Sequence, residues 1–228
     1  MFDLMIRIVR QLNTEKTYKL NENNIMDYVS NGLVLLLDGV KNTRSGHSTS
    51  TSVWEDLTEN NYDVTMENIT INNNNMYFNG NNSIMYSLSN INAVSVEMVI
   101  ELDKSSNNSQ YIAAFGTSYK VLAWSPDVKG FSLGNQKNRY FVEDPYKKSS
   151  ISVQYSPDFM YLNGIKLENS IVATNWSEVT KYPFMMSGYD TGYKLKGKIY
   201  LVRVYNRALT EDEINHNYIV DKARYGIK

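Results

Sequence analysis

Residues 197–213, GKIYLVRVYNRALTEDE, lead from a long apolar strand directly into the start of a helix, and this stretch decides the fold. Ile199–Tyr205 is apolar on both faces apart from Arg203, which predicts a central strand covered on both sides. Thr210 stands three residues before Glu213, the spacing of a capping box, in which each side chain accepts from the other's backbone N–H. A helix should therefore begin directly after the strand.

The predicted C-terminal helix is amphipathic. Ile214, Tyr218 and Tyr225 fall on one side at helical spacing, with the alkyl stem of Lys222 between them. This apolar stripe predicts that the helix lies against a sheet and has a structural role.

Alternating residues elsewhere predict further strands. In Val94–Asp103 the apolar residues recur at every second position, which predicts a sheet with one buried face and one wetter face. Residues 151–155 alternate in the same manner. Two short apolar runs flank Asn163 and Gly164, which predicts a hairpin because Asn-Gly supplies the two positive φ angles of a type I′ turn. Short strands separated by turn residues are typical of a sandwich.

Composition narrows the class of protein. The 228 residues are 42% hydrophobic, enough to bury a core without a disulfide or metal staple. Cysteine is absent, which excludes a disulfide scaffold, a thiolate zinc site and a cysteine nucleophile. A formal net charge of -1 argues against a nucleic-acid partner, since no domain-wide positive field exists. No stretch approaches the roughly 20 apolar residues that span a bilayer, so membrane insertion is not expected.

Residues 1–30 are predicted to form a partly helical N-terminal extension, followed by a globular domain at 31–228. Apolar residues recur at helical spacing in residues 1–12, but charged residues interrupt them, so the segment does not resemble a signal peptide. We therefore expect synthesis in the cytoplasm without a signal peptide. The extension could dock on its own domain or on a sister chain, which makes a homo-oligomer an expectation.

Five motifs, in their order along the chain, resemble the laminin-G-like members of the concanavalin A-like lectin/glucanase group. They are GLVLLLDG at 32–39, WEDLTENNYD at 54–63, MYFNG at 76–80, YLNG at 161–164 and the strand-to-helix stretch above. Glu59 stands where the family pattern has glycine, and Trp54 matches a position that packs inside. The resemblance implies an all-β, two-sheet antiparallel jelly-roll sandwich with ligand sites on its concave face or rim loops.

Catalytic signatures are missing from the sequence. The Glu-x-Asp-x-x-Glu motif of jelly-roll glucanases does not occur, and the nearest pair is Glu97 and Glu101. Four residues along a strand separate these by roughly 13 Å, whereas glycosidase carboxylates stand about 5 to 9.5 Å apart. We interpret both as solvated strand residues. His47 in a polar loop and His216 on the C-terminal helix lack a Gly-x-Ser-x-Gly partner motif, so no enzyme is expected.

No cofactor is expected, and calcium is left open. No Asp-x-Asn-x-Asp-Gly loop occurs, but Asp56, Asp63 and Asp190 could form a calcium site with backbone carbonyls if their loops converge. The alternative is that these carboxylates cap turns.

Ligand contacts are predicted in the loops, because aromatic rings stack on the apolar faces of sugars while polar side chains bind the hydroxyls. The candidates lie in or next to predicted loops and are Trp124, Asp127, Tyr140, Trp176, Tyr189, Asp190 and Tyr193.

The resemblance implies a non-enzymatic binding module, since some members of the group bind glycans or proteins and others occur in bacteriophage tail and receptor-binding proteins. We therefore expect a phage or phage-like tail protein that recognises a bacterial surface glycan or surface protein, located in the virion or outside the cell after lysis. The alternatives are a structural virion or assembly protein without a glycan site and a glycoside hydrolase.

Overall fold

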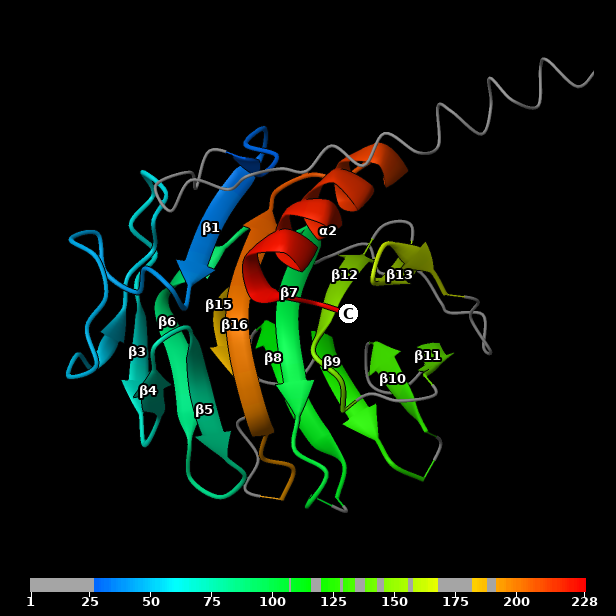
Figure 1. Cartoon of the computed structure of the whole chain (residues 1–228), viewed down its shortest axis with the longest axis horizontal. Helices are drawn as coiled ribbons and strands as arrows, with labels where there is room; N and C mark the ends of the chain where they lie inside the picture. The colour runs from blue at the N-terminus through cyan, green and yellow to red at the C-terminus, as the bar shows by residue number, and fades with distance from the viewer. Residues whose placement is uncertain are drawn as a thin grey trace, which may run out of the picture.

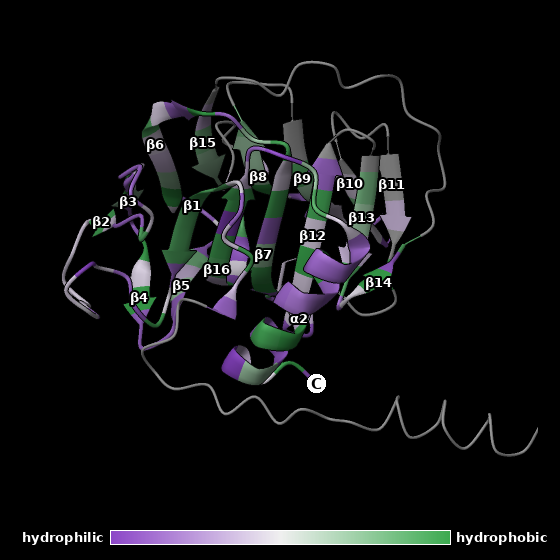
Figure 2. Ribbon diagram, turned by 90° about the horizontal axis from the view of Figure 1, so that it is seen from above, coloured by the Kyte–Doolittle hydropathy of each residue, from purple (hydrophilic) through white to green (hydrophobic). Residues whose placement is uncertain are grey.

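The computed structural model describes residues 27–228 except 107, 116–119, 128, 134–137, 143–145, 156–157, 168–181 and 188–191. The described residues form two eight-stranded sheets stacked face to face, with helix α2 on the outer side of one of them (Figures 1 and 2). All pairings among the described strands are antiparallel, from the β1–β16 pair to the β8–β9 pair. The prediction of an all-β, two-sheet sandwich with a C-terminal helix is confirmed.

Sheet I lies beneath α2, and sheet II forms the other layer. The strand order in sheet I is β14 (Ile165–Lys166), β13 (Asp158–Leu162), β12 (Ser149–Tyr155), β7 (Ser95–Leu102), β16 (Lys196–Tyr205), β5 (Asn75–Asn79) and β4 (Thr70–Asn72), and β1 (Leu33–Asp38) also pairs with β16. The order in sheet II is β11 (Asn138–Phe141), β10 (Gly130–Leu133), β9 (Lys120–Ser125), β8 (Gln110–Phe115), β15 (Tyr182–Met186), β6 (Ile84–Ile91), β3 (Val64–Glu67) and β2 (Val53–Trp54).

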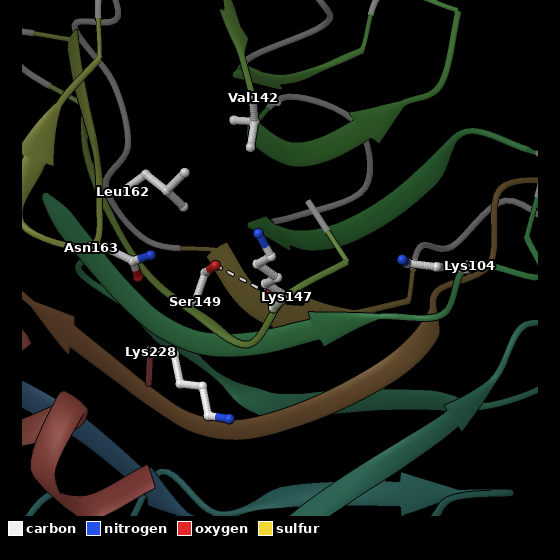
Figure 3. A pocket seen from close by; sticks show the side chains of 7 residues that line it. All are labelled: Lys104, Val142, Lys147, Ser149, Leu162, Asn163 and Lys228. Atoms are coloured by element: carbon white, nitrogen blue, oxygen red, sulfur yellow. Dashed lines mark hydrogen bonds between the residues drawn. The ribbon is translucent and has the colours of Figure 1, made fainter. Parts of the chain in front are cut away.

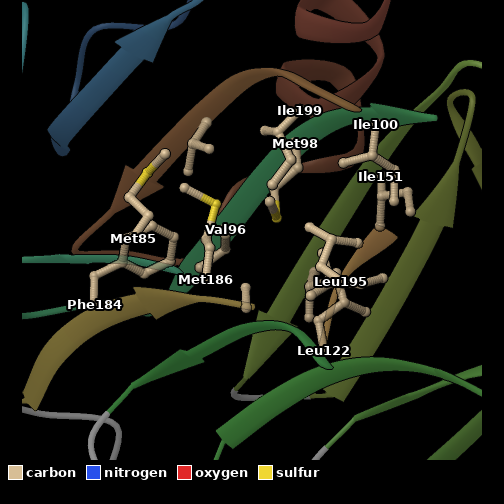
Figure 4. Close-up of a cluster of buried hydrophobic side chains, with 14 of the residues drawn as sticks. Met85, Val96, Met98, Ile100, Leu122, Ile151, Phe184, Met186, Leu195 and Ile199 are labelled. Atoms are coloured by element: carbon tan, nitrogen blue, oxygen red, sulfur yellow. The ribbon is translucent and has the colours of Figure 1, made fainter. Parts of the chain in front are cut away.

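The main core fills the space between the sheets. Alternate residues of β7 and β16, among them Met98 and Ile199, face Leu122, Phe184 and Met186 of sheet II (Figure 4). The position of β16 between β7 and β5 confirms the central strand predicted for 199–205. Trp54 is fully buried in this core, as the resemblance implied.

The predicted wetter face of β7 is wrong. Nearly every residue of this strand is buried, because α2 covers the face that points away from sheet II. A second apolar cluster forms between them, in which Val99 and Leu201 of sheet I pack with Val220 of the helix. The sequence alternation of β7 therefore separates two buried environments rather than an inside from an outside.

Helix α2 spans Glu211–Tyr225 and begins with the predicted capping box. Thr210 Oγ1 accepts from Glu213 N at 3.3 Å, and Glu213 Oε2 accepts from Thr210 N at 2.9 Å. The helix ends at Gly226, whose φ of 63° is the left-handed conformation common at helix ends. Its buried face holds Ile214 and Tyr225 as predicted, but Lys222 is exposed and the polar Asn217 and Asp221 are buried instead.

The predicted hairpin is confirmed at Asn163 and Gly164, whose φ angles are 50° and 75°. A Cβ at Gly164 would lie 2.7 Å from Tyr218 Cδ1, so glycine also allows α2 to approach the turn closely. The predicted strand at 151–155 lies within β12. Among the residues that the structure describes, no helix is long and apolar enough to cross a membrane.

The end of the N-terminal extension contacts α2. Val29 N donates to Asn217 Oδ1 at 3.0 Å, the Asp27 carbonyl lies 2.6 Å from His216 Nε2, and Tyr28 is buried. The helix predicted within residues 1–12 lies outside the described residues.

Glu213→Gln should lower the free energy of unfolding by about 0.5 to 1 kcal/mol at pH 7. Hydrogen bonds from Arg207, then from Thr210, lower the pKa of Glu213 from its usual 4.5 to about 2, and glutamine keeps the cap but loses the charge. Because the folded pKa lies below the unfolded value, the wild-type advantage is present above pH 4.5 and is lost as the pH falls toward 2. Urea unfolding of both proteins across this range measures the difference, and an advantage independent of pH would contradict the ionic contribution.

Candidate functional site

A cleft of about 520 Å³ opens at the edge of the sandwich, where β12 and β13 of sheet I approach the end of β11 in sheet II (Figure 3). Its lining comes from five separate parts of the chain. Lys104 follows β7, Val142 follows β11, and Lys228 follows α2. Lys147 precedes β12 and Ser149 begins it, whereas Leu162 ends β13 and Asn163 follows in the turn. The cleft therefore exists only in the folded sandwich.

Hydrogen bonds hold one wall of the cleft. Asn163 N donates to Ser150 O at 2.8 Å, and Asn163 Oδ1 accepts from Ser150 N at 2.9 Å. Since Oδ1 is engaged, the Nδ2 group is the part of this amide that can donate to a ligand. Ser149 Oγ donates to Lys147 O at 3.1 Å, which fixes the chain just before β12.

The lining combines charge, polarity and apolar surface. Lys104, Lys147 and Lys228 are exposed, and Figure 3 shows the Lys147 side chain extending toward the space between Val142 and Leu162. No Asp or Glu is among the described residues that line the cleft. Ammonium and amide donors beside an apolar wall can bind a polar ligand that also has C–H faces.

Trp124 and Tyr140, two of the predicted ligand residues, lie in strands rather than in rim loops, and a ligand role for them stays a prediction. They lie in β9 and β11 with exposed fractions of 2% and 1%, and both belong to the core between the sheets. Phe131 of β10 stands between them, paired with Trp124 on one side and Tyr140 on the other. One inward-facing aromatic on each of three neighbouring strands is a core pattern, and the cross-strand register that aligns them is visible only in the folded sheet.

Asp127 and Tyr193, two further predicted ligand residues, are not among the residues that line the cleft. Asp127 is exposed in the turn between β9 and β10, and Tyr193 is 41% exposed with its ring centroid 5.0 Å from that of Tyr111. A ligand role for Asp127 and Tyr193 stays a prediction. Three further candidates lie outside the described residues and are Trp176, Tyr189 and Asp190.

Glu97 is not the solvated residue that the sequence suggested. It is 2% exposed beneath α2, and its Oε2 accepts from Arg203 Nε at 3.0 Å and Asn217 Nδ2 at 2.7 Å. Burial raises the pKa of Glu97 above its usual range, although the Arg203 charge acts in the opposite direction.

Glu101 is half-buried and accepts from Lys198 Nζ at 3.1 Å and Tyr200 Oη at 2.7 Å. Partial burial raises its pKa, but the hydrogen bonds from Tyr200 and Lys198 outweigh this effect and hold the pKa below the usual value. Both members of the carboxylate pair considered for catalysis are therefore engaged in contacts within sheet I and with α2.

Asp56 and Asp63, two of the residues considered as ligands of a calcium site, accept hydrogen bonds from nearby donors. Asp56 is buried, and its carboxylate accepts from the backbone N–H groups of Leu36, Thr58 and Tyr62 at 2.9 to 3.0 Å. Asp63 accepts from Asp56 N and pairs with Arg44. Within the described ranges, no group of three or more His, Asp or Glu side chains could hold a metal ion.

Comparison with known proteins supports the fold without assigning a family. No family model matches this chain, and no curated protein matches its sequence. Among solved structures, Trypanosoma rangeli sialidase superposes with a TM-score of 0.66 at 15% identity over 96% of this chain and 39% of that chain. Domain 4 of AbnA, a GH43 extracellular arabinanase from Geobacillus stearothermophilus in complex with arabinotriose, superposes with a TM-score of 0.59 at 13% identity over 80% of this chain and 96% of that domain.

These identities show the likeness of the fold alone. This chain spans 39% of the sialidase, so the activity of that whole protein does not transfer to it. The match to the arabinanase is to an isolated domain of nearly the same extent. The two neighbours reported above are a sialidase and a domain of an arabinanase in complex with arabinotriose, and both names concern carbohydrates.

Proposed function

We propose that this chain is a non-enzymatic module that binds a glycan in the cleft between β11, β12 and β13. The observation that carries the proposal is the mixed lining: the Ser149 hydroxyl, the Asn163 amide and three lysines stand beside the apolar side chains of Val142 and Leu162. A sugar presents hydroxyls to the first group and C–H faces to the second. The carbohydrate-related structural neighbours support this ligand class.

The proposed module binds its glycan without hydrolysing it. Glycoside hydrolysis needs two carboxylates about 5 to 9.5 Å apart on either side of the scissile bond. The described lining of the cleft supplies none, and Glu97 and Glu101 are engaged with Arg203, Lys198 and Tyr200. A glycoside hydrolase remains the enzymatic alternative, and release of product from a bound glycan would favour it.

The biological setting that we propose is recognition of a bacterial surface glycan by a phage or phage-like tail protein, in the virion or outside the cell. This part of the proposal is supported by the sequence resemblance, as is association of several copies through residues 1–30. Binding of the purified protein to whole bacterial cells tests the setting, and light scattering with and without residues 1–26 tests the association.

The proposal predicts that the full chain binds a subset of glycans on an array and that Leu162→Trp weakens this binding at least about tenfold. Leu162 lines the cleft, so an indole at this position should occupy the space of the ligand. Ile165→Trp is the matched control, because Ile165 is the cross-strand partner of Leu162 but is 69% exposed and does not line the cleft.

Equal binding by both tryptophan variants would exclude the cleft as the site. If the wild-type protein bound neither the array nor whole cells, the structural alternative would replace the proposal. Far-ultraviolet circular dichroism of each variant verifies that the sandwich is intact.

A further inference from the structure

We infer that residues 27–30, which we call the N-terminal strap, form a conformational device that sets the wall of the cleft. Docking of the strap against α2 and sheet I is transmitted to the cleft by a continuous chain of contacts. The meaning of this device for ligand binding rests on the proposed function, but the coupling itself is a property of the empty protein. The chain of contacts consists of Tyr28, Arg203, Asp221, Ser150 and Asn163.

The strap is held at three successive residues. Val29 N donates to Asn217 Oδ1 at 3.0 Å, and the Asp27 carbonyl lies 2.6 Å from His216 Nε2. Between them, Tyr28 is only 5% exposed and packs in the apolar cluster that joins α2 to sheet I. The strap is therefore attached to the helix and to the sheet beneath it.

Tyr28 covers the buried charges beneath α2. The guanidinium carbon of Arg203 lies over the face of the Tyr28 ring, 4.0 Å from its centroid. The Nη1 and Nη2 groups of Arg203 donate to the two oxygens of Asp221 at 2.7 and 2.8 Å. A cation over an aromatic face is attracted most strongly where water is excluded. Release of Tyr28 should therefore admit water to the Arg203–Asp221 pair and loosen it.

Ser150 of β12 joins this ion pair to the cleft. Its Oγ donates to Asp221 Oδ2 at 2.7 Å. Its backbone holds Asn163 twice, because Asn163 N donates to Ser150 O at 2.8 Å and Ser150 N donates to Asn163 Oδ1 at 2.9 Å. Asn163 is one of the residues that line the cleft (Figure 3). Direct contacts therefore lead from the strap to the wall of the cleft.

A second connection runs along the end of α2. Tyr28 shares its apolar cluster with Tyr225 and Ile227. Lys148 Nζ, next to the start of β12, donates to Tyr225 O at 2.9 Å and so attaches the end of the helix to sheet I. Lys228 follows Ile227 and lines the cleft. The strap thus supports the cleft both at the turn after β13 and at the residue that follows α2.

A coupling of this kind is reciprocal. If release of the strap changes the ligand affinity of the cleft by some factor, an occupied cleft changes the docking of the strap by the same factor. Chains of packed side chains and hydrogen bonds can carry such coupling, and it typically amounts to about 5- to 150-fold. The sequence continues from the strap to residue 1, so a partner that binds there can act on the cleft through Tyr28.

The test is NMR-detected hydrogen exchange of single backbone amides in the full chain without a ligand. Tyr28→Ala removes the ring, whereas Tyr28→Phe removes only Oη, which is buried without a hydrogen-bond partner among the described residues. Tyr28→Ala should accelerate exchange at Ser150 and Asn163 about tenfold, and Tyr28→Phe should stay within about twofold of wild type. The Gly80 amide, which donates to Leu195 O at 2.9 Å outside the path, should exchange at the same rate in all three proteins.

Met66→Ala is the control for a general loss of stability. Met66 is 6% exposed, nearly as buried as Tyr28, but it lies in β3 and packs in the main core. A cavity there should accelerate exchange at Gly80 and Asn163 by similar factors, because both amides then open through the same destabilised sandwich.

A double-mutant comparison tests the path itself. Ser150→Ala removes the hydroxyl that donates to Asp221, so in this background Tyr28→Ala should accelerate Asn163 exchange by less than about threefold. Ser152→Ala is the matched control, because Ser152 is also buried and lies two residues further on the same face of β12. In that background the effect of Tyr28→Ala should remain about tenfold.

Three outcomes would overturn the inference. Unchanged exchange at Asn163 in Tyr28→Ala would mean that the strap and the cleft wall are independent. Equal acceleration at Gly80 and Asn163 would mean general destabilisation, and an undiminished effect in the Ser150→Ala background would exclude the path through Asp221. If Tyr28→Ala does not fold, Tyr28→Leu keeps an apolar side chain without the ring and gives the same comparison. None of these measurements needs a glycan, so a failure of the proposed function is a separate result.

Discussion

Arg203→Met should lower the free energy of unfolding by at least about 3 kcal/mol. Arg203 is completely buried beneath α2, where its Nη1 and Nη2 donate to the two oxygens of Asp221 at 2.7 and 2.8 Å and its Nε donates to Glu97 at 3.0 Å. Methionine fills a similar volume, but it leaves two buried carboxylates without their cation. Such uncompensated charges cost more than the loss of the ion pairs themselves.

The other partners of this network increase the expected effect. Ser150 Oγ of β12 donates to Asp221 Oδ2 at 2.7 Å, and Asn217 joins Glu97 to Tyr205 Oη. The guanidinium carbon of Arg203 lies over the face of the Tyr28 ring, 4.0 Å from the ring centroid. Loss of Arg203 should therefore loosen the attachment of α2, β12 and the N-terminal segment to β7 and β16 at once.

Urea unfolding measures the loss, and two variants serve as controls. Arg207→Met breaks only the partly exposed Arg207–Glu213 pair and should cost about 1 kcal/mol or less. The triple variant Arg203→Met, Glu97→Leu and Asp221→Leu removes all three charges and should recover much of the stability that Arg203→Met loses. A loss below about 1 kcal/mol for Arg203→Met would contradict the network's role.

The effect of Arg203→Met should shrink in acid. Burial raises the folded-state pKa of Glu97 above its unfolded value of 4.5, and removal of Arg203 removes the charge that opposes this rise. A carboxyl with a raised folded pKa favours the folded state below the unfolded pKa and loses this contribution as the pH rises through the folded value. The loss relative to wild type should therefore be smaller near pH 4.5 than at pH 7, and unfolding curves at both values measure it.

Trp54→Ala should lower the free energy of unfolding by about 3 to 5 kcal/mol. Trp54 lies in β2 with no exposed surface, packed in the main core, and its Nε1 donates to Asp38 O at 3.0 Å. Alanine leaves a cavity and removes a buried hydrogen bond between β2 and the end of β1. The urea midpoint should fall while the slope of the transition stays unchanged, because a core cavity changes stability rather than the surface exposed on unfolding.

A pair of conservative variants isolates the hydrogen bond. Trp54→Phe and Trp124→Phe remove similar volumes from the same core, but Trp124 Nε1 is buried without a hydrogen-bond partner among the described residues. Trp54→Phe should therefore destabilise the protein by about 1 kcal/mol more than Trp124→Phe. Equal losses would mean that the Trp54–Asp38 bond makes no net contribution.

Local sequence patterns were sufficient to predict the elements that form through contacts between residues close together in the sequence. The Asn163-Gly164 hairpin depends on two positive φ angles, and the start of α2 depends on contacts between Thr210 and Glu213 three residues apart. The period-two alternation of β7 likewise predicted the strand, since side chains on a strand point to opposite faces. The family resemblance, which combines several such motifs in order, predicted the sandwich.

The same alternation could not reveal what covers each face. In β7, Glu97 looked solvated because it alternates with apolar residues, but α2 buries it against an arginine that lies 106 positions later in the sequence. In β9, Trp124 looked like a rim residue because predicted turns flank it, but its strand turns the ring into the core. Both errors concern which partner lies opposite a face, and strand periodicity contains no information about this partner.

The sequence by itself determined the class of fold, its central strand, its hairpin turn and its terminal helix. Only the tertiary structure decided that Glu97, Arg203 and Asp221 form one buried network and that Lys104, Lys147 and Lys228 line one cleft. The physical reason is how far apart in the sequence the interacting residues lie. Turns and caps form between residues a few positions apart, whereas the network and the cleft exist only where sheets and helix bring distant segments together.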